Sequence, residues 1–375
     1  MPERPTGGQR AVIVGLAIGS AKRDDAGLDE LAALATSAGA TVVGRVTGRR
    51  PAPDPGLYAG RGKVDEIARL RDAERADIVI FDHALTGVQQ RNLEQALACR
   101  VVDRTSLILD IFAQRARSAE GKLQVELAQL AHLSTRLVGG WTHLERQKGG
   151  IGLRGPGETQ LETDRRLITR RVKVLKARLA RVTVSRGVQS RTRKRARVRT
   201  VALVGYTNAG KSTLFNRLAR ERVYAADQLF ATLDTTLRRV HVPGAEPIVL
   251  SDTVGFIRDL PHDLVAAFRA TLSEAADADL LVHVVDASAP DRDAQVDAVE
   301  RVIAEIGAGD LPRITVLNKI DAAALAPGVE RDACGTIRTV RLSALTGEGC
   351  PAFVAALAER FPAAGVYADT AAAGP

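Results

Sequence analysis

Residues 200–213 contain the sequence feature that most restricts the fold. The apolar run TVALV at 200–204 leads directly into GYTNAGKST at 205–213, which matches G-x-x-x-x-G-K-S/T, and helix-forming residues follow at 214–220. A strand, a glycine-rich loop and a helix in this order form a phosphate-binding loop, in which backbone N–H groups surround phosphate oxygens. The motif therefore predicts a doubly wound α/β domain that binds a nucleotide.

Three residue positions in and after this loop predict the phosphate chemistry. Lys211 places a point charge at the β- and γ-phosphate oxygens, and Ser212 offers a hydroxyl to Mg²⁺. Asp252 follows the apolar run 248–251, where it can hold Mg²⁺ through a water molecule, and Gly255 is placed to sense the γ-phosphate. Two loops that become ordered on the γ-phosphate and relax after its hydrolysis are typical of a GTPase.

A third Mg²⁺ ligand is expected from the segment FATLD at 230–234, which we interpret as a switch segment. Thr232 is the candidate, and its hydroxyl would join that of Ser212 on the ion. Thr235 and Thr236 are alternatives that the spacing leaves open.

The choice of base is predicted by NKID at 318–321, after the apolar run 314–317. A carboxylate at Asp321 can accept hydrogen bonds from both N1–H and the exocyclic amino group of guanine, whereas adenine has no such pair of donors. A buried, unpaired carboxylate would cost about 1–3 kcal/mol, which favours guanine. SAL at 343–345, after 339–342, is expected to offer the Ala344 N–H to guanine O6.

These motifs define the candidate site. The catalytic assignments are Lys211, Thr232 and Gly255, and the metal ligands are Ser212, Thr232 and, through water, Asp252. The residues assigned to the nucleotide are Gly205, Tyr206, Thr207, Asn208, Ala209, Gly210, Lys211, Ser212 and Thr213 in the loop, Phe230, Ala231, Thr232, Leu233 and Asp234 in the switch segment, Asp252, Thr253, Val254 and Gly255 after the next strand, and Asn318, Lys319, Asp321, Ser343, Ala344 and Leu345 around the base.

Phe256 stands where Ras-like enzymes carry the glutamine that orients the attacking water. A phenyl ring can neither donate nor accept that hydrogen bond. The substitution predicts slow intrinsic hydrolysis that depends on a partner or on a second cation. Asn208 is a candidate ligand for K⁺, although its side chain is equally suited to stabilising the turn.

Residues 1–104 predict a separate α/β domain. Short β-rich runs at 12–14, 41–43, 77–81 and 101–102 alternate with amphipathic stretches at 28–38 and 64–73, which indicates a mostly parallel sheet. GRG at 60–62 lacks the third glycine and the preceding strand of a dinucleotide fingerprint. Residues 11–21 read as a first strand rather than a signal peptide, and three cysteines without a C-x-x-C pair suit a reducing compartment. We therefore expect a cytosolic protein with no membrane span.

Residues 105–184 are expected to form an antiparallel helical hairpin. One apolar seam runs through Leu123, Leu127, Leu130 and Leu137, and a second through Leu161, Ile168, Val172, Leu175, Leu179 and Val182. A glycine-rich tip at 139–158 separates them, with seven glycines in the 19 residues 139–157. The tip is longer than a structural turn requires. A polar, basic linker at 185–199 would lead into the nucleotide domain at 200–362, and 363–375 is expected to be disordered.

The charge of the chain is concentrated in one segment. Residues 165–199 hold 15 Lys and Arg residues and no acidic residue, which is more than the net charge of +9 for the whole chain. A segment of this kind suits a polyanion such as nucleic acid, although a solvated helix face is the alternative. Aromatic residues make up only 3% of the chain, so base stacking on aromatic side chains is not expected to dominate.

Three segments resemble the HflX branch of the Obg-related translational GTPases: 205–212, 230–234 and, above all, GGIGLRGPGETQLETDRR at 149–166. The resemblance extends over about residues 11–360. It implies a family-specific N-terminal domain, a helical hairpin and a GTPase domain that together bind the large ribosomal subunit, and a function in rescuing stalled ribosomes by subunit splitting. One departure is Thr235 after Asp234, where a proline is expected in the family; it bears on switch geometry.

The resemblance implies a monomer whose ligands are Mg²⁺ and GTP or GDP and whose partner is ribosomal RNA near the peptidyl-transferase centre. The expected RNA contacts are Trp141, Arg146, Lys148 and Arg154 in the tip and Arg165, Arg166, Arg170 and Arg171 in the second helix. Two other hypotheses remain open. One is a GTP-dependent factor for ribosome assembly or RNA handling that does not split ribosomes, and the other makes the N-terminal unit a small-molecule domain regulated by the switch.

Overall fold

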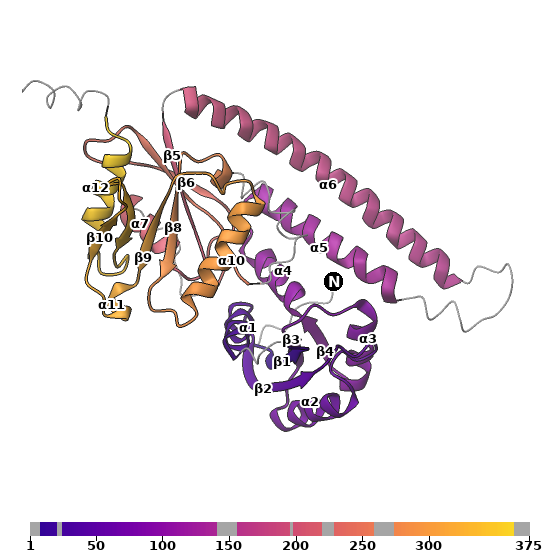
Figure 1. The fold of residues 1–375 in the computed structure, drawn as a ribbon. Helices are drawn as coiled ribbons and strands as arrows, with labels where there is room; N and C mark the ends of the chain where they lie inside the picture. Colours follow the sequence, from indigo (N-terminus) through magenta and orange to yellow (C-terminus); the bar gives the residue numbers. More distant parts are fainter. Residues whose placement is uncertain are drawn as a thin grey trace, which may run out of the picture. The chain divides into compact units, whose positions relative to one another are not determined.

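The computed structural model describes residues 8–20, 25–140, 156–195, 198–219, 229–258 and 274–363 (Figure 1). The chain divides into two compact units. One comprises Met1–Gln114 and Lys122–Leu179, and the other comprises Arg115–Gly121 and Ala180–Pro375.

The first unit contains a four-stranded sheet in the order β2-β1-β3-β4. All three strand pairs are parallel, as the alternation of β-rich and amphipathic runs predicts. The strands are β1 (Arg10–Ile18), β2 (Thr41–Arg50), β3 (Ile78–Phe81) and β4 (Arg100–Asp103). The helices between and after them are α1 (Asp25–Ser37), α2 (Arg61–Glu74), α3 (Gly87–Leu97) and α4 (Arg104–Arg115).

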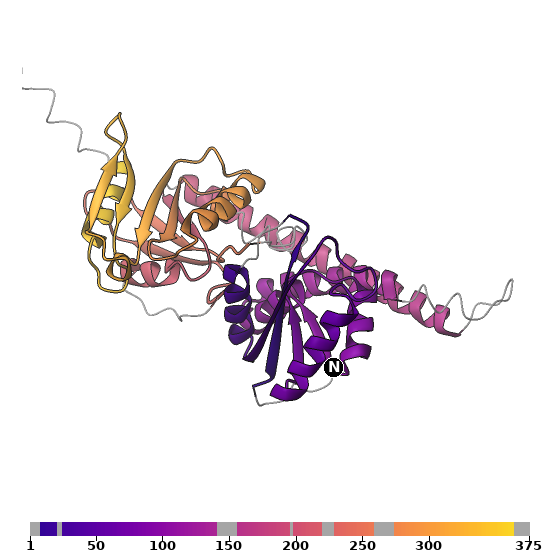
Figure 2. The ribbon, with the colours of Figure 1, turned by 60° about the horizontal axis from the view of Figure 1, so that its bottom comes forward.

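Helices cover both faces of this sheet, because β1 and β3 are buried on both sides. Val12 and Val14 of β1 pack in one cluster with Ile67 of α2 and Leu93 of α3. Figure 2 shows α1 (indigo) and α2 (purple) on opposite sides of the strands. The arrangement is that of a doubly wound α/β unit.

Two long helices, α5 (Ala119–Gly140) and α6 (Pro156–Arg195), follow α4. Within the first unit they lie side by side in both views (Figures 1 and 2). Glu126 of α5 accepts a hydrogen bond from Nε of Arg171 on α6 at 2.7 Å. Most of the predicted tip, residues 141–155, lies outside the described residues, as does the tail from 364 onward.

The boundary predicted between helix and linker at 184/185 is wrong. Helix α6 continues through residues 185–195, because this stretch has no proline and is rich in Arg, Lys and Gln, which favour helix. The second apolar seam is confirmed where its side chains are described. Leu175 is fully buried, and Ile168, Val172, Leu179 and Val182 are half-buried among exposed neighbours.

The second unit is built on a seven-stranded sheet in the order β10-β11-β9-β8-β5-β7-β6. Its edge strands β6 and β10 are antiparallel to their neighbours, and the other pairs are parallel. The strands are β5 (Arg199–Gly205), β6 (Thr236–Val240), β7 (Ile248–Asp252), β8 (Leu280–Asp286), β9 (Arg313–Asn318), β10 (Gly328–Arg331) and β11 (Ile337–Arg341). The helices are α7 (Lys211–Ala219), α10 (Arg292–Glu305), α11 (Ile320–Ala323) and α12 (Cys350–Arg360).

One core cluster joins the sheet to α7 and α12 through Phe215 and Phe353, whereas α10 packs on β5 and β8. The parallel strands bring their carboxyl ends to one edge of the sheet. The phosphate loop follows β5, Asp252 ends β7, and Asn318 ends β9. Ligands bind at this edge of an open parallel sheet, so the predicted motifs meet there.

Candidate functional site

The phosphate loop connects β5 to α7 and takes a conformation that only glycine permits at two positions. A Cβ on Gly205 (φ +150°) would lie 2.2 Å from the carbonyl oxygen of Val284, and one on Gly210 (φ +92°) would lie 2.1 Å from Nδ2 of Asn318. Asn208 has a left-handed φ of 61°, which asparagine tolerates better than most residues. This conformation supports the turn-forming interpretation of Asn208, and its binding of K⁺ stays a prediction.

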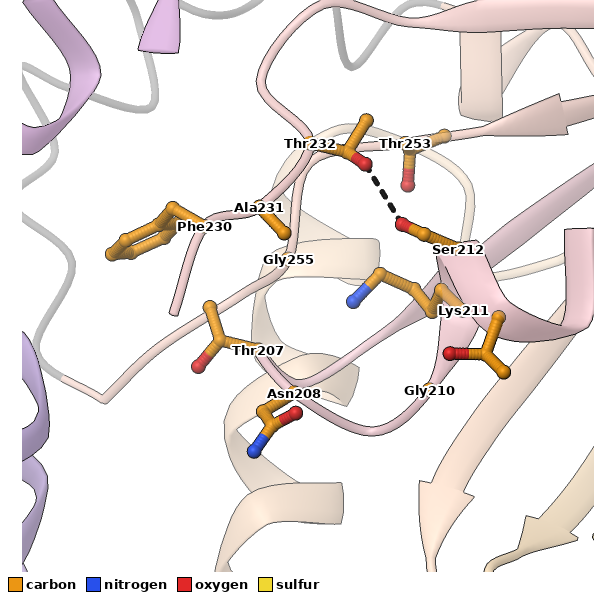
Figure 3. Close-up of a pocket in the computed structure, with 11 residues that line it drawn as sticks. Thr207, Asn208, Gly210, Lys211, Ser212, Phe230, Ala231, Thr232, Thr253 and Gly255 are labelled. Atoms are coloured by element: carbon orange, nitrogen blue, oxygen red, sulfur yellow. Dashed lines mark hydrogen bonds between the residues drawn. The ribbon is translucent and has the colours of Figure 1, made fainter. Parts of the chain in front are cut away.

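Lys211 begins α7 and is only 6% exposed. Its Nζ donates hydrogen bonds to the carbonyl oxygens of Gly205 (3.0 Å) and Tyr206 (2.7 Å), so that the loop curls around the ammonium group. Figure 3 shows this amine projecting into the pocket between the phosphate loop and Gly255. The geometry presents one positive charge to the space that phosphates would occupy.

Three oxygen atoms converge beside the loop. The hydroxyls of Ser212 and Thr232 are 2.7 Å apart (Figure 3), and Oδ2 of Asp252 accepts hydrogen bonds from them at 2.7 and 3.0 Å. Neighbouring ligands of an octahedral Mg²⁺ lie about 3 Å apart, since each Mg–O bond is about 2.1 Å. Asp252 is fully buried, and among the described residues its Oδ1 has no hydrogen-bond partner. The donor set therefore suits Mg²⁺, with Thr232 in the position that the sequence left open between it, Thr235 and Thr236.

The segment after Asp252 lies against the phosphate loop. Thr207 N–H donates to the carbonyl of Phe256 at 2.7 Å, and Phe256 N–H donates to that of Gly205 at 3.1 Å. A Cβ on Gly255 would lie 2.8 Å from Cα of Thr207 and 3.0 Å from Nζ of Lys211. The backbone at Gly255 therefore approaches the phosphate site as closely as a chain can. The Phe256 side chain is completely buried in the core.

Asn318 joins the base-recognition loops to the phosphate loop. Its Nδ2 donates to the Ala209 carbonyl, and its Oδ1 accepts from the Ala344 N–H, both at 2.8 Å. The Ala344 N–H predicted to bind guanine O6 is thus already paired, and that contact requires this hydrogen bond to open. Lys319 (φ 61°) forms an ion pair with Asp286 at 2.7 Å. Asp321 is exposed at this edge of the sheet.

Arg217 is a positioning residue that the sequence analysis missed. It lies on α7, and its guanidinium donates to the carbonyl oxygens of Ala344 (2.6 Å) and Leu345 (2.5 Å). The helix that carries Lys211 therefore also holds the loop 343–345. No motif signals this role, because Arg217 meets carbonyl oxygens more than 120 residues away in the chain.

The five residues of the predicted switch segment take different environments. Phe230, with a left-handed φ of 55°, and Leu233 are buried, while Ala231 and Thr232 line the pocket. The carboxylate of Asp234 accepts hydrogen bonds from the backbone of Arg117 and Ser118. Of the expected ligands for the nucleotide, Asp234 is thus the one whose side chain binds another part of the protein.

The predicted RNA contacts divide between described and undescribed residues. Trp141, Arg146, Lys148 and Arg154 lie outside the described residues. Arg165, Arg166, Arg170 and Arg171 are exposed on α6, where Arg171 pairs with Glu126.

Three family models match consecutive parts of the chain. They are "GTP-binding GTPase N-terminal" at residues 25–113, "GTP-binding GTPase Middle Region" at 115–193 and "50S ribosome-binding GTPase" at 200–319. The protein named GTPase HflX in Escherichia coli K12 is 56% identical over 361 residues, which are 96% of this chain and 84% of that protein. This chain belongs to the HflX family of GTPases.

Other relatives agree with this assignment. GTPase HflX of Caldanaerobacter subterraneus subsp. tengcongensis is 50% identical over 325 residues, which are 86% of this chain and 76% of that protein. The crystal structure of SsGBP with GDP has a TM-score of 0.52 at 24% identity and covers 94% of this chain and 98% of that one, which shows a shared fold. This HflX-family protein binds GTP and GDP and hydrolyses GTP. None of the described helices is both long and apolar enough to cross a membrane.

Burial changes the proton affinity of both charged groups in the phosphate site. It lowers the pKa of Lys211 to about 8, although the negative charge of Asp252 acts in the opposite direction. Burial likewise raises the pKa of Asp252, opposed by the hydroxyl of Ser212 and by the charge of Lys211. The empty site is therefore short of charge stabilisation, and bound phosphates would supply it for the lysine.

We expect GTP affinity to fall at alkaline pH. A phosphate restores the protonated form of Lys211, so binding above pH 8 must take up a proton, whereas binding below about pH 7 need not. Affinity should be about fourfold weaker at pH 8.5 than at pH 7, from a free-site pKa of about 8. Titration with a fluorescent GTP analogue measures this. Lys211→Arg, which stays protonated, should show no such dependence whatever its absolute affinity; a flat wild-type profile would contradict the assignment.

Proposed function

We propose that this HflX-family protein is a nucleotide-gated GTPase that binds the large ribosomal subunit and splits or recycles stalled ribosomes in the cytoplasm, acting as a monomer. The observation that carries the proposal is the convergence of Thr232 with Ser212 and Asp252, because it lets the γ-phosphate and its metal ion control the position of the switch segment. The family model that matches residues 200–319 is described as a 50S ribosome-binding GTPase, which favours the large subunit as partner.

Mg²⁺ is the metal that these residues fit. Ser212 and Thr232 would bind it through their hydroxyls, and Asp252 would accept from its bound water. When bound, the ion neutralises charge that develops on the β- and γ-phosphate oxygens. Lys211 adds a second positive charge from the opposite side of the pocket, and the backbone at Gly255 closes the site around the γ-phosphate.

The buried Phe256 side chain supports the proposal of slow intrinsic hydrolysis. With its ring in the core, this position presents only backbone to the phosphate site and supplies no group that orients an attacking water. A ribosomal partner or a second cation would have to complete the site. Stimulation by the bound ribosome would restrict hydrolysis to the complex and couple it to release of the protein.

The basic face of α6 supports RNA as the surface that is recognised. Arg165, Arg166 and Arg170 are exposed in successive turns of the helix, and the unit holds the two helices together through Arg171 and Glu126. Arginines on one exposed face are suited to contact with phosphate groups along a folded RNA. We propose that this face and the glycine-rich tip contact ribosomal RNA near the peptidyl-transferase centre.

Sedimentation of intact ribosomes distinguishes the proposed function from its alternatives. We expect that this protein with Mg²⁺ and a non-hydrolysable GTP analogue converts ribosomes into subunits and sediments with the large one. GDP should leave the ribosomes intact. Intact particles that carry the protein would instead indicate an assembly or RNA-handling factor, and no co-sedimentation would reject the ribosome as partner.

A charge-reversal variant controls for the RNA surface. Arg165→Glu with Arg166→Glu should lose ribosome binding and keep GTP hydrolysis, because both residues lie outside the GTPase unit. Arg301→Glu, on an exposed position of α10, is the matched control and should bind as the wild type does. Equal binding by all three proteins would remove α6 from the proposed interface.

A further inference from the structure

Asp234 forms an unusually complete set of hydrogen bonds with a segment more than 110 residues earlier in the chain. Its Oδ2 accepts from the N–H of Arg117 at 2.8 Å and from that of Ser118 at 2.7 Å. Its Oδ1 accepts from the hydroxyl of Ser118 at 2.5 Å. Residues 115–121 belong to the same compact unit as the GTPase domain, so these contacts lie within one unit.

These donors mark the start of α5. Ser118 precedes the first residue of the helix, and its Oγ also accepts from the N–H of Gly121 at 2.8 Å, which is the geometry of a helix cap. A carboxylate at this end also complements the positive pole of the helix. Asp234 therefore extends the cap of α5 from a distant part of the chain.

The contact is also tight. A Cβ on Gly121 would lie 2.1 Å from Oδ1 of Asp234 and 3.1 Å from Oγ of Ser118. A glycine in the first turn of a helix is otherwise unfavourable by about 1 kcal/mol relative to alanine. Here it leaves room for the approach of the carboxylate.

Asp234 is only two residues after Thr232, whose hydroxyl belongs to the set of oxygens around the proposed Mg²⁺. Two residues span at most about 7 Å, and Leu233 between them is buried. Thr232 therefore cannot move several ångströms away from Ser212 without moving Asp234 as well. At the other end, α5 is 22 residues long, or about 33 Å, and continues to the glycine-rich tip.

We propose that Asp234 is a positioning residue that fastens the nucleotide-sensing Thr232 to the beginning of α5, so that the state of the nucleotide is transmitted to the helical hairpin through the cap of that helix. The inference rests on the proposed role of Thr232 in binding Mg²⁺. With a triphosphate, Thr232 is held at the metal and the cap is formed; after loss of the γ-phosphate, the segment 230–234 is released and the cap opens. Because coupling is reciprocal, a ligand that fixes the start of α5 also raises the affinity for GTP.

Nucleotide affinities of Asp234→Asn and Ser118→Ala test this coupling. An asparagine side chain cannot accept from all three donors, so we expect about tenfold weaker binding of a non-hydrolysable GTP analogue, as for a lost hydrogen bond to a charged group. GDP affinity should change less than twofold. Adding Ser118→Ala to Asp234→Asn should have little further effect, because both substitutions break one cap. Asp310→Asn, at an exposed position of the same unit, is the matched control.

Hydrogen exchange provides the readout that separates coupling from a structural role. In the wild type, amides at 117–122 should exchange more slowly with the GTP analogue than with GDP, and this difference should vanish in Asp234→Asn and in Ser118→Ala. Equal loss of affinity for both nucleotides, or identical protection in both nucleotide states of the wild type, would overturn the proposal. Neither measurement uses ribosomes, so this inference and the proposed ribosomal function can fail independently.

A pair of glycine variants tests the tight approach. Gly121→Ala should weaken binding of the GTP analogue while GDP affinity is kept, since the added methyl group displaces Asp234. Gly62→Ala in α2 adds the same methyl group where no atom lies within 4 Å, and it should leave both affinities unchanged. Unchanged GTP-analogue affinity in Gly121→Ala would contradict the contact.

Discussion

Asp321→Asn is expected to change the nucleotide preference of this GTPase from GTP to XTP by about 10²–10³-fold, on the basis of one hydrogen-bond acceptor turned into a donor. The carboxylate accepts from N1–H and from the exocyclic amino group of guanine. The amide of asparagine instead presents its own N–H₂ to that amino group, whereas xanthine carries a carbonyl there and can accept from it. Asp321 is exposed at the nucleotide edge, so the substitution should leave the fold intact.

Competition between GTP and XTP for the protein measures this preference. Asp310→Asn makes the same chemical change at an exposed position between α10 and β9 and should retain the preference for GTP. If Asp321→Asn still selects GTP, the assignment of base recognition to NKID at 318–321 does not hold.

Thr232→Ala is expected to slow GTP hydrolysis about 100-fold, a typical loss when one group that stabilises developing charge is removed. The hydroxyl of Thr232 is within 3.0 Å of both other oxygens of the proposed Mg²⁺ site, so its loss leaves the metal less firmly held on the γ-phosphate side. GDP affinity should change little, because the switch segment contributes only when a γ-phosphate is present.

Single-turnover release of phosphate at saturating Mg²⁺ measures this loss. Thr236→Ala is the matched control, because Thr236 pairs with Asp252 in the β6–β7 ladder through its backbone and its hydroxyl is not part of the three-oxygen cluster. We expect its hydrolysis rate to stay within about twofold, as for surface substitutions away from such a feature. A greater loss in Thr236→Ala than in Thr232→Ala would reassign the metal ligand.

The phosphate site could be predicted from the sequence because its determinants are local. Gly205, Gly210 and Lys211 lie within seven residues, and the strand and helix that flank them are continuous runs. The parallel sheets also followed from the alternation of β-rich and amphipathic stretches, and the order of motifs along the chain placed Asp252 and Asn318 at strand ends. Periodicity failed at residues 185–195, where composition suggested a linker and good helix formers continue α6.

The remaining site features depend on contacts between residues distant in the chain, for which a single sequence carries no signal. Arg217 meets Ala344, and Asp234 meets Ser118, each across more than 110 residues. The burial of Phe256 follows from the packing of the core rather than from its neighbours in sequence. The prediction for Asp234 failed to anticipate its partner because an acidic residue in a switch segment is equally compatible with solvent, metal and a helix cap.

The central claim is that the γ-phosphate controls engagement of the ribosome. The most direct test measures the affinity of the purified protein for large ribosomal subunits when it is empty, loaded with GDP and loaded with a non-hydrolysable GTP analogue, at one fixed salt and Mg²⁺ concentration. We predict tight binding only in the analogue-bound state, and binding at least tenfold weaker in the other two, as typical allosteric coupling allows. Equal affinity in all three states would contradict the account.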